Sequence, residues 1–284
     1  MKIVTFDDNT NNMKTCFVTC ALKNHFPGLE KLVSSISQAI DSTGSDLCVI
    51  SPDEVKLDGV KFFSSHPKKD TYEGINSLPH KHYDTSRWYP ATWYKFEAFG
   101  MRGYDRVIYL DSDMLAVKDI SELATDEKLN TRPIWFTLNP EEEDKRDSNI
   151  FYNPDLHKRI TSYRRTVSTG IMVINMDQIS KFTRQGLIYL AEVGRTYDGT
   201  DQGVVNQWLE EKEINFGVLG KEYNHLATNK IEDDTKIIHY FGRKPWDSGN
   251  DPLTIIPDTS DFRVENDELW REYEQQAPYG ATLE

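Results

Sequence analysis

The residues best suited to chemistry in this chain are Asp111 and Asp113, which are separated by a single serine. The preceding segment, 106–110, reads Arg-Val-Ile-Tyr-Leu, and its apolar run predicts a buried strand. In an open α/β sheet, ligands bind outside the carboxyl ends of the strands. An Asp-x-Asp pair there offers the hard oxygen ligands of Mg²⁺ or Mn²⁺, which substrate phosphates commonly complete. The pattern therefore points to metal-dependent chemistry on a phosphate compound, although Asp and Ser are also ordinary turn residues.

A second segment of the same kind ends in a histidine. The apolar pair 237–238 leads into His239, and Gly242 follows three residues later, where it allows close backbone approach to a ligand. Lys244 supplies a point charge for phosphate. Taken alone, His239 is more often a hydrogen-bonded core residue. Beside two carboxylates, a neutral imidazole favours Mn²⁺ over Mg²⁺.

A third segment contains Asp198, Asp201 and Gln202 among glycines at the start of a predicted helix. One reading is a helix start in which the dipole of the first turn stabilises Asp201. The other is functional, because the segment also aims a carboxylate and an amide beyond the helix N-terminus.

The elements that must position these residues alternate between strand-like and helix-like segments. Predicted strands cover 15–20, 46–50, 106–110, 133–138, 167–175 and 236–240. Predicted helices begin at Pro27, cover 92–101, bury Ile179, Phe182 and Leu190, and follow a cap at Thr200. This alternation predicts an α/β fold with a mostly parallel, doubly wound sheet. Gly170, inside one strand, marks a bulge or a close approach by a ligand.

The length of 284 residues suits one α/β domain, and no internal repeat or linker divides it. We expect an N-terminal extension at 1–13, the domain at 14–249 and a tail at 250–284 that could wrap the domain. The polar segment 64–89 predicts a long loop.

Composition narrows the class of protein. With 33 basic and 46 acidic residues, the formal net charge of −13 argues against nucleic-acid partners. The absence of a long apolar run and the polar start of the chain predict a cytoplasmic protein without a membrane partner. Three cysteines without metal-ligand spacing are expected to be buried and reduced. The composition is also compatible with a homodimer.

Taken in order, five segments resemble the retaining glycosyltransferases of family eight, the group of glycogenin and galactinol synthase. They are 17–19, 111–113, 168–170, 198–203 and 239–246. The resemblance implies a GT-A fold, which is a Rossmann-like, mostly parallel twisted sheet flanked by helices in a single domain. It also implies a UDP-sugar donor and Mn²⁺, with Mg²⁺ as an alternative.

The resemblance assigns roles to individual residues. Asp111, Asp113 and His239 would hold the metal. Lys95, Asp201 and Gln202 would take catalytic roles. The donor would lie against Thr19, Cys20, Leu22, Phe26, Arg87, Ser112, Ser168, Thr169, Asp198, Gly242 and Lys244.

The chain also departs from the family pattern. Ser168-Thr169-Gly170 stands where the family usually has Asn-Ser-Gly, which alters the hydrogen bonding near the sugar. The segment after Tyr223 does not match the self-glucosylated segment of glycogenin. We therefore expect transfer of a hexose or pentose from a UDP-sugar to a hydroxyl group of a glycan, a polyol, a protein or a modified base.

Two other classes of protein share part of this pattern. A non-catalytic nucleotide-sugar-binding module could keep both aspartates. A haloacid-dehalogenase-type phosphatase also places Asp-x-Asp after a strand, but Met114 and Leu115 stand here in place of its usual glycine-containing pair.

Overall fold

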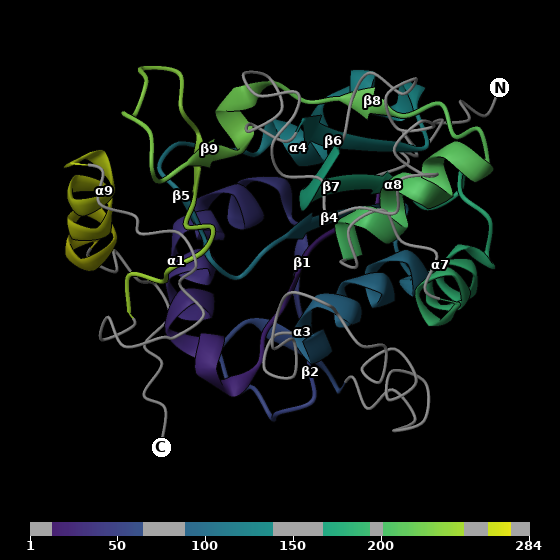
Figure 1. The fold of residues 1–284 in the computed structure, drawn as a ribbon, viewed down its shortest axis with the longest axis horizontal. Coiled ribbons are helices and arrows are strands. Elements are labelled where there is room, and N and C mark those ends of the chain that lie inside the picture. Colours follow the sequence, from purple (N-terminus) through teal and green to yellow (C-terminus); the bar gives the residue numbers. More distant parts are fainter. Residues whose placement is uncertain (1–12, 65–88, 139–166, 194–200, 247–260, 274–284) are drawn as a thin grey trace, which may run out of the picture.

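The computed structural model describes residues 13–64, 89–138, 167–193, 201–246 and 261–273. Its centre is a seven-stranded sheet with the strand order β3-β2-β1-β4-β7-β6-β8 (Figure 1). The strands are β1 Thr15–Cys20, β2 Asp46–Ser51, β3 Val60–Ser64, β4 Arg106–Leu110, β6 Ile134–Leu138, β7 Val167–Asn175 and β8 Gly217–Val218. β7 runs antiparallel to both of its neighbours, and the other pairs are parallel. The expected mostly parallel sheet is thereby confirmed.

Helices cover both faces of this sheet. Alternate side chains of β1 enter different core clusters, with Cys16 and Val18 on one face and Phe17 on the other. The Phe17 face is covered by α1 Phe26–Thr43 and α4 Glu122–Thr125. The opposite face is covered by α3 Tyr89–Tyr94, the 3-10 turn η3 Lys95–Gly100, α7 Thr183–Glu192 and α8 Asp201–Glu211.

Helix α1 follows directly from its sequence. Pro27 lies in the first turn, where its missing N–H costs nothing, and Gly44 ends the helix with a φ of 63°. Leu29, Leu32 and Ile36 are buried at helical spacing. The helix predicted to start at Pro27 is confirmed.

A second, three-stranded sheet was not predicted as such. It consists of β5 Met114–Ala116, β10 Ile237–His239 and β9 His225–Leu226, in the order β5-β10-β9. β5 and β10 are antiparallel, and Met114 lies opposite His239. Only β10 was expected from the sequence, as part of the longer apolar segment 236–240, whereas β5 and β9 are too short to show a periodicity.

Three details of the helices differ from the prediction. Phe182 was expected in the core but is 65% exposed, because it precedes α7 with non-helical backbone angles. The single helix expected at 92–101 is α3 followed by η3. The tail contains a helix that was not predicted, α9 at Asp261–Glu272.

Several predicted features lie wholly or largely outside the described residues: the N-terminal extension, the loop 64–89, the cap at Thr200 and much of the tail. None of the described helices combines the length and the apolarity needed to cross a bilayer. All three cysteines are buried and free, as expected.

Candidate active site

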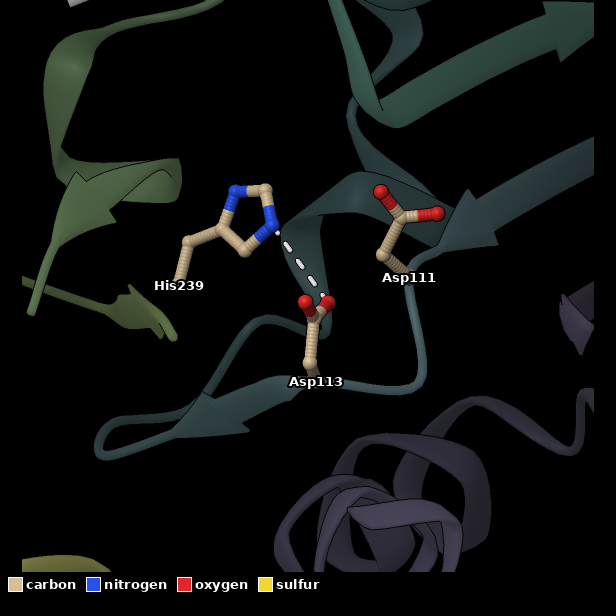
Figure 2. A group of neighbouring side chains, drawn as sticks. All are labelled: Asp111, Asp113 and His239. Atoms are coloured by element: carbon tan, nitrogen blue, oxygen red, sulfur yellow. Dashed lines mark ion pairs between the residues drawn. The ribbon is translucent and has the colours of Figure 1, made fainter. Parts of the chain in front are cut away.

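The two sheets bring Asp111, Asp113 and His239 together. Asp111 follows β4, Asp113 immediately precedes β5, and His239 ends β10. The β5–β10 pairing continues past its ends, since the backbone N–H of Tyr240 donates to the carbonyl of Asp113 over 2.9 Å. Figure 2 shows the three side chains converging on one space, and their ligand atoms all lie within 4.8 Å of one another. The small second sheet is therefore what places the histidine beside the carboxylates.

Gly170 permits this convergence. A Cβ atom on Gly170 would lie 2.9 Å from both the Cε1 atom of His239 and the Cε atom of Met114. The register between β6 and β7 also shifts beside this segment. The bulge expected at Gly170 is present, and the groups that approach it are His239 and Met114, so a side chain there would force at least one of them to move.

Asn224 determines which nitrogen of His239 faces the carboxylates. The Nδ1 atom of His239 lies 2.8 Å from the Oδ1 atom of Asn224. With that oxygen assigned as the acceptor, Nδ1 carries the proton and Nε2 presents its lone pair. Nε2 lies 3.3 Å from the Oδ1 atom of Asp113, a buried oxygen without a hydrogen-bond partner in the described structure. Two electron-pair donors that face each other suit a cation.

Lys95 lies between two carboxylates on the other side of the site. Its Nζ atom is 3.1 Å from the Oδ1 atom of Asp111 and 2.7 Å from the Oδ2 atom of Asp201. The hydroxyl of Thr169 donates to the same Asp201 oxygen over 2.7 Å. Burial lowers the pKa of Lys95, but Asp111 and Asp201 outweigh it and raise that pKa above its ordinary value. Lys95 is therefore a fixed cation and cannot act as a base.

Asp111 and Asp113 have different neighbours. The hydroxyl of Tyr109 donates to the Oδ1 atom of Asp111 over 2.7 Å. Burial raises the pKa of Asp111, although Lys95 opposes it. Burial also acts to raise the pKa of Asp113, but the ammonium of Lys244 is the largest opposing influence, and that pKa lies well below its usual range.

Lys244 reaches the site because the chain turns sharply after β10. Gly242 has a φ of 77°, which other residues rarely adopt, and it turns the backbone between His239 and Lys244. The ammonium of Lys244 forms an ion pair with Asp113 and donates to the carbonyl of Tyr240 over 3.1 Å. Gly242 thus makes the turn that brings Lys244 to Asp113, while the ligand contacts expected of both residues stay predictions.

Of the remaining residues with expected roles, some border the site and others lie outside the described residues. Gln202 accepts from the N–H of Thr169 over 3.4 Å, and Ser168 accepts from the N–H of Gly170 over 3.3 Å, so both border the site. Ser112 is buried between the two aspartates. Arg87 and Asp198 lie outside the described residues.

The residues expected near the nucleoside lie at the end of β1 and the start of α1, and none of their described hydrogen bonds reaches the aspartates. Thr19 is buried, and its hydroxyl has no partner in the described structure. Cys20 is also buried, and desolvation raises the pKa of its thiol well above the ordinary value, which excludes a thiolate nucleophile. Leu22 and Phe26 are half-buried against the core.

Sequence reasoning missed Asn224 and Tyr109 as site residues. Tyr109 lies two residues before Asp111 in a predicted strand, so the alternation of that strand could have placed it near the site. Asn224 had no such signal, since its position depends on β9 pairing with β10.

Comparison with known proteins shows the family to which the chain belongs. Residues 16–249 match the model of Glycosyl transferase family 8, and this range includes every residue of the site described above. The chain belongs to glycosyl transferase family 8. This membership confirms the family resemblance seen in the sequence.

Two curated relatives of this family 8 chain are distant. It is 26% identical over 181 residues to lipopolysaccharide 1,2-glucosyltransferase of Escherichia coli (strain K12), which covers 57% of the chain and 51% of that protein. It is 24% identical over 173 residues to human glycogenin-1, which covers 56% of the chain and 41% of that protein. The matches thus span only about half of each relative, and the low identity fits a protein other than glycogenin.

Solved structures confirm the GT-A fold. Galactosyltransferase LgtC, in complex with donor and acceptor sugar analogs, has a TM-score of 0.62 at 16% identity and covers 90% of this chain and 95% of LgtC. The bifunctional glycosyltransferase WbbM has a TM-score of 0.57 at 19% identity, with 94% and 50% covered. GlyE of Streptococcus pneumoniae TIGR4 has a TM-score of 0.54 at 16% identity, with 91% and 63% covered.

Proposed function

We propose that this family 8 glycosyltransferase transfers a hexose or pentose, with retention of configuration, from a UDP-sugar to an acceptor hydroxyl with Mn²⁺ as cofactor. The observation that carries the proposal is the Asp111–Asp113–His239 cluster, in which the lone pair of an imidazole faces an oxygen that has no hydrogen-bond partner among the described residues. Family membership favours sugar transfer over the phosphatase alternative.

The donor set fits a divalent cation. Two carboxylates and one imidazole offer mixed oxygen and nitrogen ligands, a combination that suits Mn²⁺ better than Mg²⁺. Asp111, Asp113 and the Nε2 atom of His239 would hold the ion. When bound, the ion would neutralise the negative charge that develops on the departing diphosphate.

Lys244 changes partner in this scheme. In the structure its ammonium neutralises Asp113. A cation bound by Asp113 would take over that neutralisation, which releases Lys244 to bind a donor phosphate. The short turn at Gly242 keeps the ammonium within reach of either partner.

Asp201 lies beside the metal cluster and not within it, since Lys95 and Thr169 hold its carboxylate. We assign it to the transferred sugar, where it would bind hydroxyls or stabilise the positive charge at the anomeric carbon. In a same-face displacement, the acceptor oxygen forms the new bond as the bond between carbon and phosphate oxygen breaks. The leaving phosphate oxygen then takes the acceptor proton. In the rival scheme Asp201 is a nucleophile.

The acceptor remains a choice among hydroxyl compounds. The two curated relatives are named for different activities, so their names do not select one for this chain. The acidic net charge of −13 favours a glycan, a polyol or a protein over a nucleic acid.

The first test is a thermal-shift panel of nucleotide diphosphates and nucleotide sugars, with and without Mn²⁺. At about a hundred times the Kd, a ligand contributes about 2.7 kcal/mol, which raises the Tm by several degrees. We expect stabilisation by UDP and Mn²⁺ together that exceeds the sum of their separate effects, and slow hydrolysis of one UDP-sugar. The absence of a response to any nucleotide diphosphate would overturn the proposal.

A matched pair of variants ties the response to the site. Asp113→Asn should abolish the joint response. Asp119→Asn should keep it, because Asp119 is an exposed residue that accepts from the N–H of Ser121, a role that asparagine also fills. Equal loss in both variants would show that the response does not come from the cluster.

Asp201→Asn tests the mechanism separately. We expect this variant to keep its affinity for UDP with Mn²⁺ and to lose turnover. Loss of that affinity would contradict the placement of Asp201 at the sugar, and a trapped glycosyl ester on Asp201 in the wild-type protein would favour the nucleophilic scheme.

A further inference from the structure

Helix α9 lies beyond the range that matches the family, yet it packs against the segment that supplies Lys244. In Figure 1 it is found beside α1, on the side of the molecule away from α7 and α8. The ring of Trp270 in α9 lies 5.3 Å from that of Trp246. The indole N–H of Trp246 in turn donates to the carbonyl of Asn24, just before α1, over 3.3 Å. The end of the segment is thus held between α9 and α1.

Arg263 connects α9 to the turn itself. Its side chain is fully buried, and its Nε atom donates to the Oδ1 atom of Asp267 over 2.7 Å. The guanidinium also donates to the carbonyl of Phe241 over 3.3 Å and to the carbonyl of Arg243. Asp267 accepts from the side chain of Arg243 as well. These bonds hold the backbone on both sides of Gly242.

Asn266 connects the same helix to the second sheet. Its amide donates to the carbonyls of Ala227 and Asn229 over 2.8 and 3.0 Å. Its backbone carbonyl accepts from the hydroxyl of Tyr240 over 2.7 Å. One helical turn of α9 therefore contacts both the segment that follows β9 and the segment that follows β10.

A buried arginine that donates to backbone carbonyls is well suited to fixing a turn. A guanidinium presents several N–H groups in a rigid plane, so carbonyls on both sides of a residue with positive φ can be held at once. A segment held in this way loses little further freedom when a ligand binds.

We propose that α9 positions the phosphate-binding segment 240–244, and that Arg263 is a positioning residue which acts through Lys244. This inference rests on the proposed function, because it takes the donor diphosphate as the ligand of Lys244. The described contacts of Arg263 are with the backbone of the turn, with Asp267 and with the ring of Tyr240.

A double-mutant cycle separates this role from a merely structural one. The affinity for UDP at saturating Mn²⁺ is measured by calorimetry for Arg263→Lys and Lys244→Ala, singly and together. Arg263→Lys should weaken binding by about five- to twentyfold in the wild-type background and by less than about twofold with Lys244→Ala. Glu265→Gln, at an exposed position of the same helix, should have no effect. Equal losses in both backgrounds would overturn the proposal.

Hydrogen exchange gives a second reading that needs no ligand. In Arg263→Lys, the amide of Tyr240, which donates to the carbonyl of Asp113, should exchange faster while those of β1 and β4 stay protected. If that variant does not fold, Tyr240→Phe replaces it, since it removes one hydrogen bond to α9 and should also speed the exchange of this amide. Unchanged exchange in the folded variant would contradict the inference alone, whereas failure of the wild-type protein to bind UDP with Mn²⁺ would contradict the proposed function.

Discussion

Asp111 and Asp113 stand two residues apart in the sequence, and their surroundings shift their pKa values in opposite directions. Asp111 belongs to the main sheet, where burial raises its pKa although Lys95 and the hydroxyl of Tyr109 are close. Asp113 precedes the edge strand of the second sheet, where the ammonium of Lys244 opposes burial and the pKa lies well below the usual range.

The difference follows from how each cation is shared. Lys95 divides its charge between Asp111 and Asp201, so each carboxylate is only partly neutralised. Asp113 has the ammonium of Lys244 to itself, paired with one of its two oxygens. Asp113 is therefore anionic throughout the working pH range, while keeping Asp111 ionised costs stability that a bound cation would restore.

Replacing each aspartate in turn should have the largest effect. Both variants should lose Mn²⁺ affinity, but they should change the stability of the metal-free protein in opposite directions. Asp113→Asn and Asp111→Asn each remove a metal ligand. Affinity for Mn²⁺ should therefore fall by more than the roughly 10- to 100-fold that loss of a ligand's hydrogen-bond partner costs. Electron paramagnetic resonance of free Mn²⁺ measures this loss.

The two variants should differ in the free energy of unfolding measured without metal. A carboxyl with a lowered pKa adds stability above its unfolded pKa, and one with a raised pKa subtracts it. Asp113→Asn should therefore destabilise the protein at pH 7 by about 3–5 kcal/mol, because Lys244 loses its buried partner. Asp111→Asn should keep or raise stability in urea unfolding, and equal destabilisation by the two would contradict the comparison.

Removing Lys95 should destabilise the protein, because Asp111 and Asp201 share this cation. Lys95→Met leaves the buried carboxylate of Asp201 and the partly buried one of Asp111 without their cation, so the free energy of unfolding should fall by about 3–5 kcal/mol. Mn²⁺ should then stabilise this variant more than the wild-type protein, since the ion replaces part of the lost charge.

The control for Lys95 is a lysine–carboxylate pair at a more exposed place. Lys236 pairs with Glu122, and both side chains are about a third exposed. Lys236→Met should therefore cost about 1 kcal/mol or less in urea unfolding. If Lys95→Met also cost only about 1 kcal/mol, the ion pairs of Lys95 would be worth no more than an exposed pair.

Replacing Asn224, the hydrogen-bond partner of His239, should have a smaller effect on Mn²⁺ affinity than replacing a metal ligand. Asn224→Ala frees the Nδ1 atom of His239, so the tautomer that directs the Nε2 lone pair at the metal is no longer selected. Mn²⁺ affinity should fall by about 10- to 100-fold. Asn224→Asp, which keeps an acceptor at the same place, should retain most of the affinity, and an equal loss in both variants would exclude the tautomer as the cause.

The sequence predicted those parts of the molecule that depend on local patterns. β1, β4 and α1 have apolar runs or helical spacing long enough to identify, and Asp111 and His239 follow such runs directly. The family resemblance then related segments far apart in the chain.

The features that escaped prediction depend on long-range packing. β5 and β9 have three and two residues, and they exist because β10 lies between them. Asn224 becomes a site residue only through that pairing. Phe182 was placed in the core because its spacing fits a helix, but α7 begins one residue later. Helix α9 has polar buried residues, Arg263, Asn266 and Asp267, which an apolar pattern cannot reveal.

Tyr109→Phe should have the smallest effect and refines the comparison. The variant removes one hydrogen bond to the Oδ1 atom of Asp111 and leaves Lys95 as its neighbour. Because that bond favours the ionised carboxylate, its loss should raise the pKa of Asp111 further and weaken Mn²⁺ binding a few-fold. Stability without metal should change by about 1 kcal/mol. The decisive measurement is Mn²⁺ affinity against pH: in Tyr109→Phe the affinity should begin to fall at a higher pH than in the wild-type protein, since protons compete with the metal for Asp111. A curve that moves to lower pH, or does not move, would mean that the hydroxyl does not stabilise the anion.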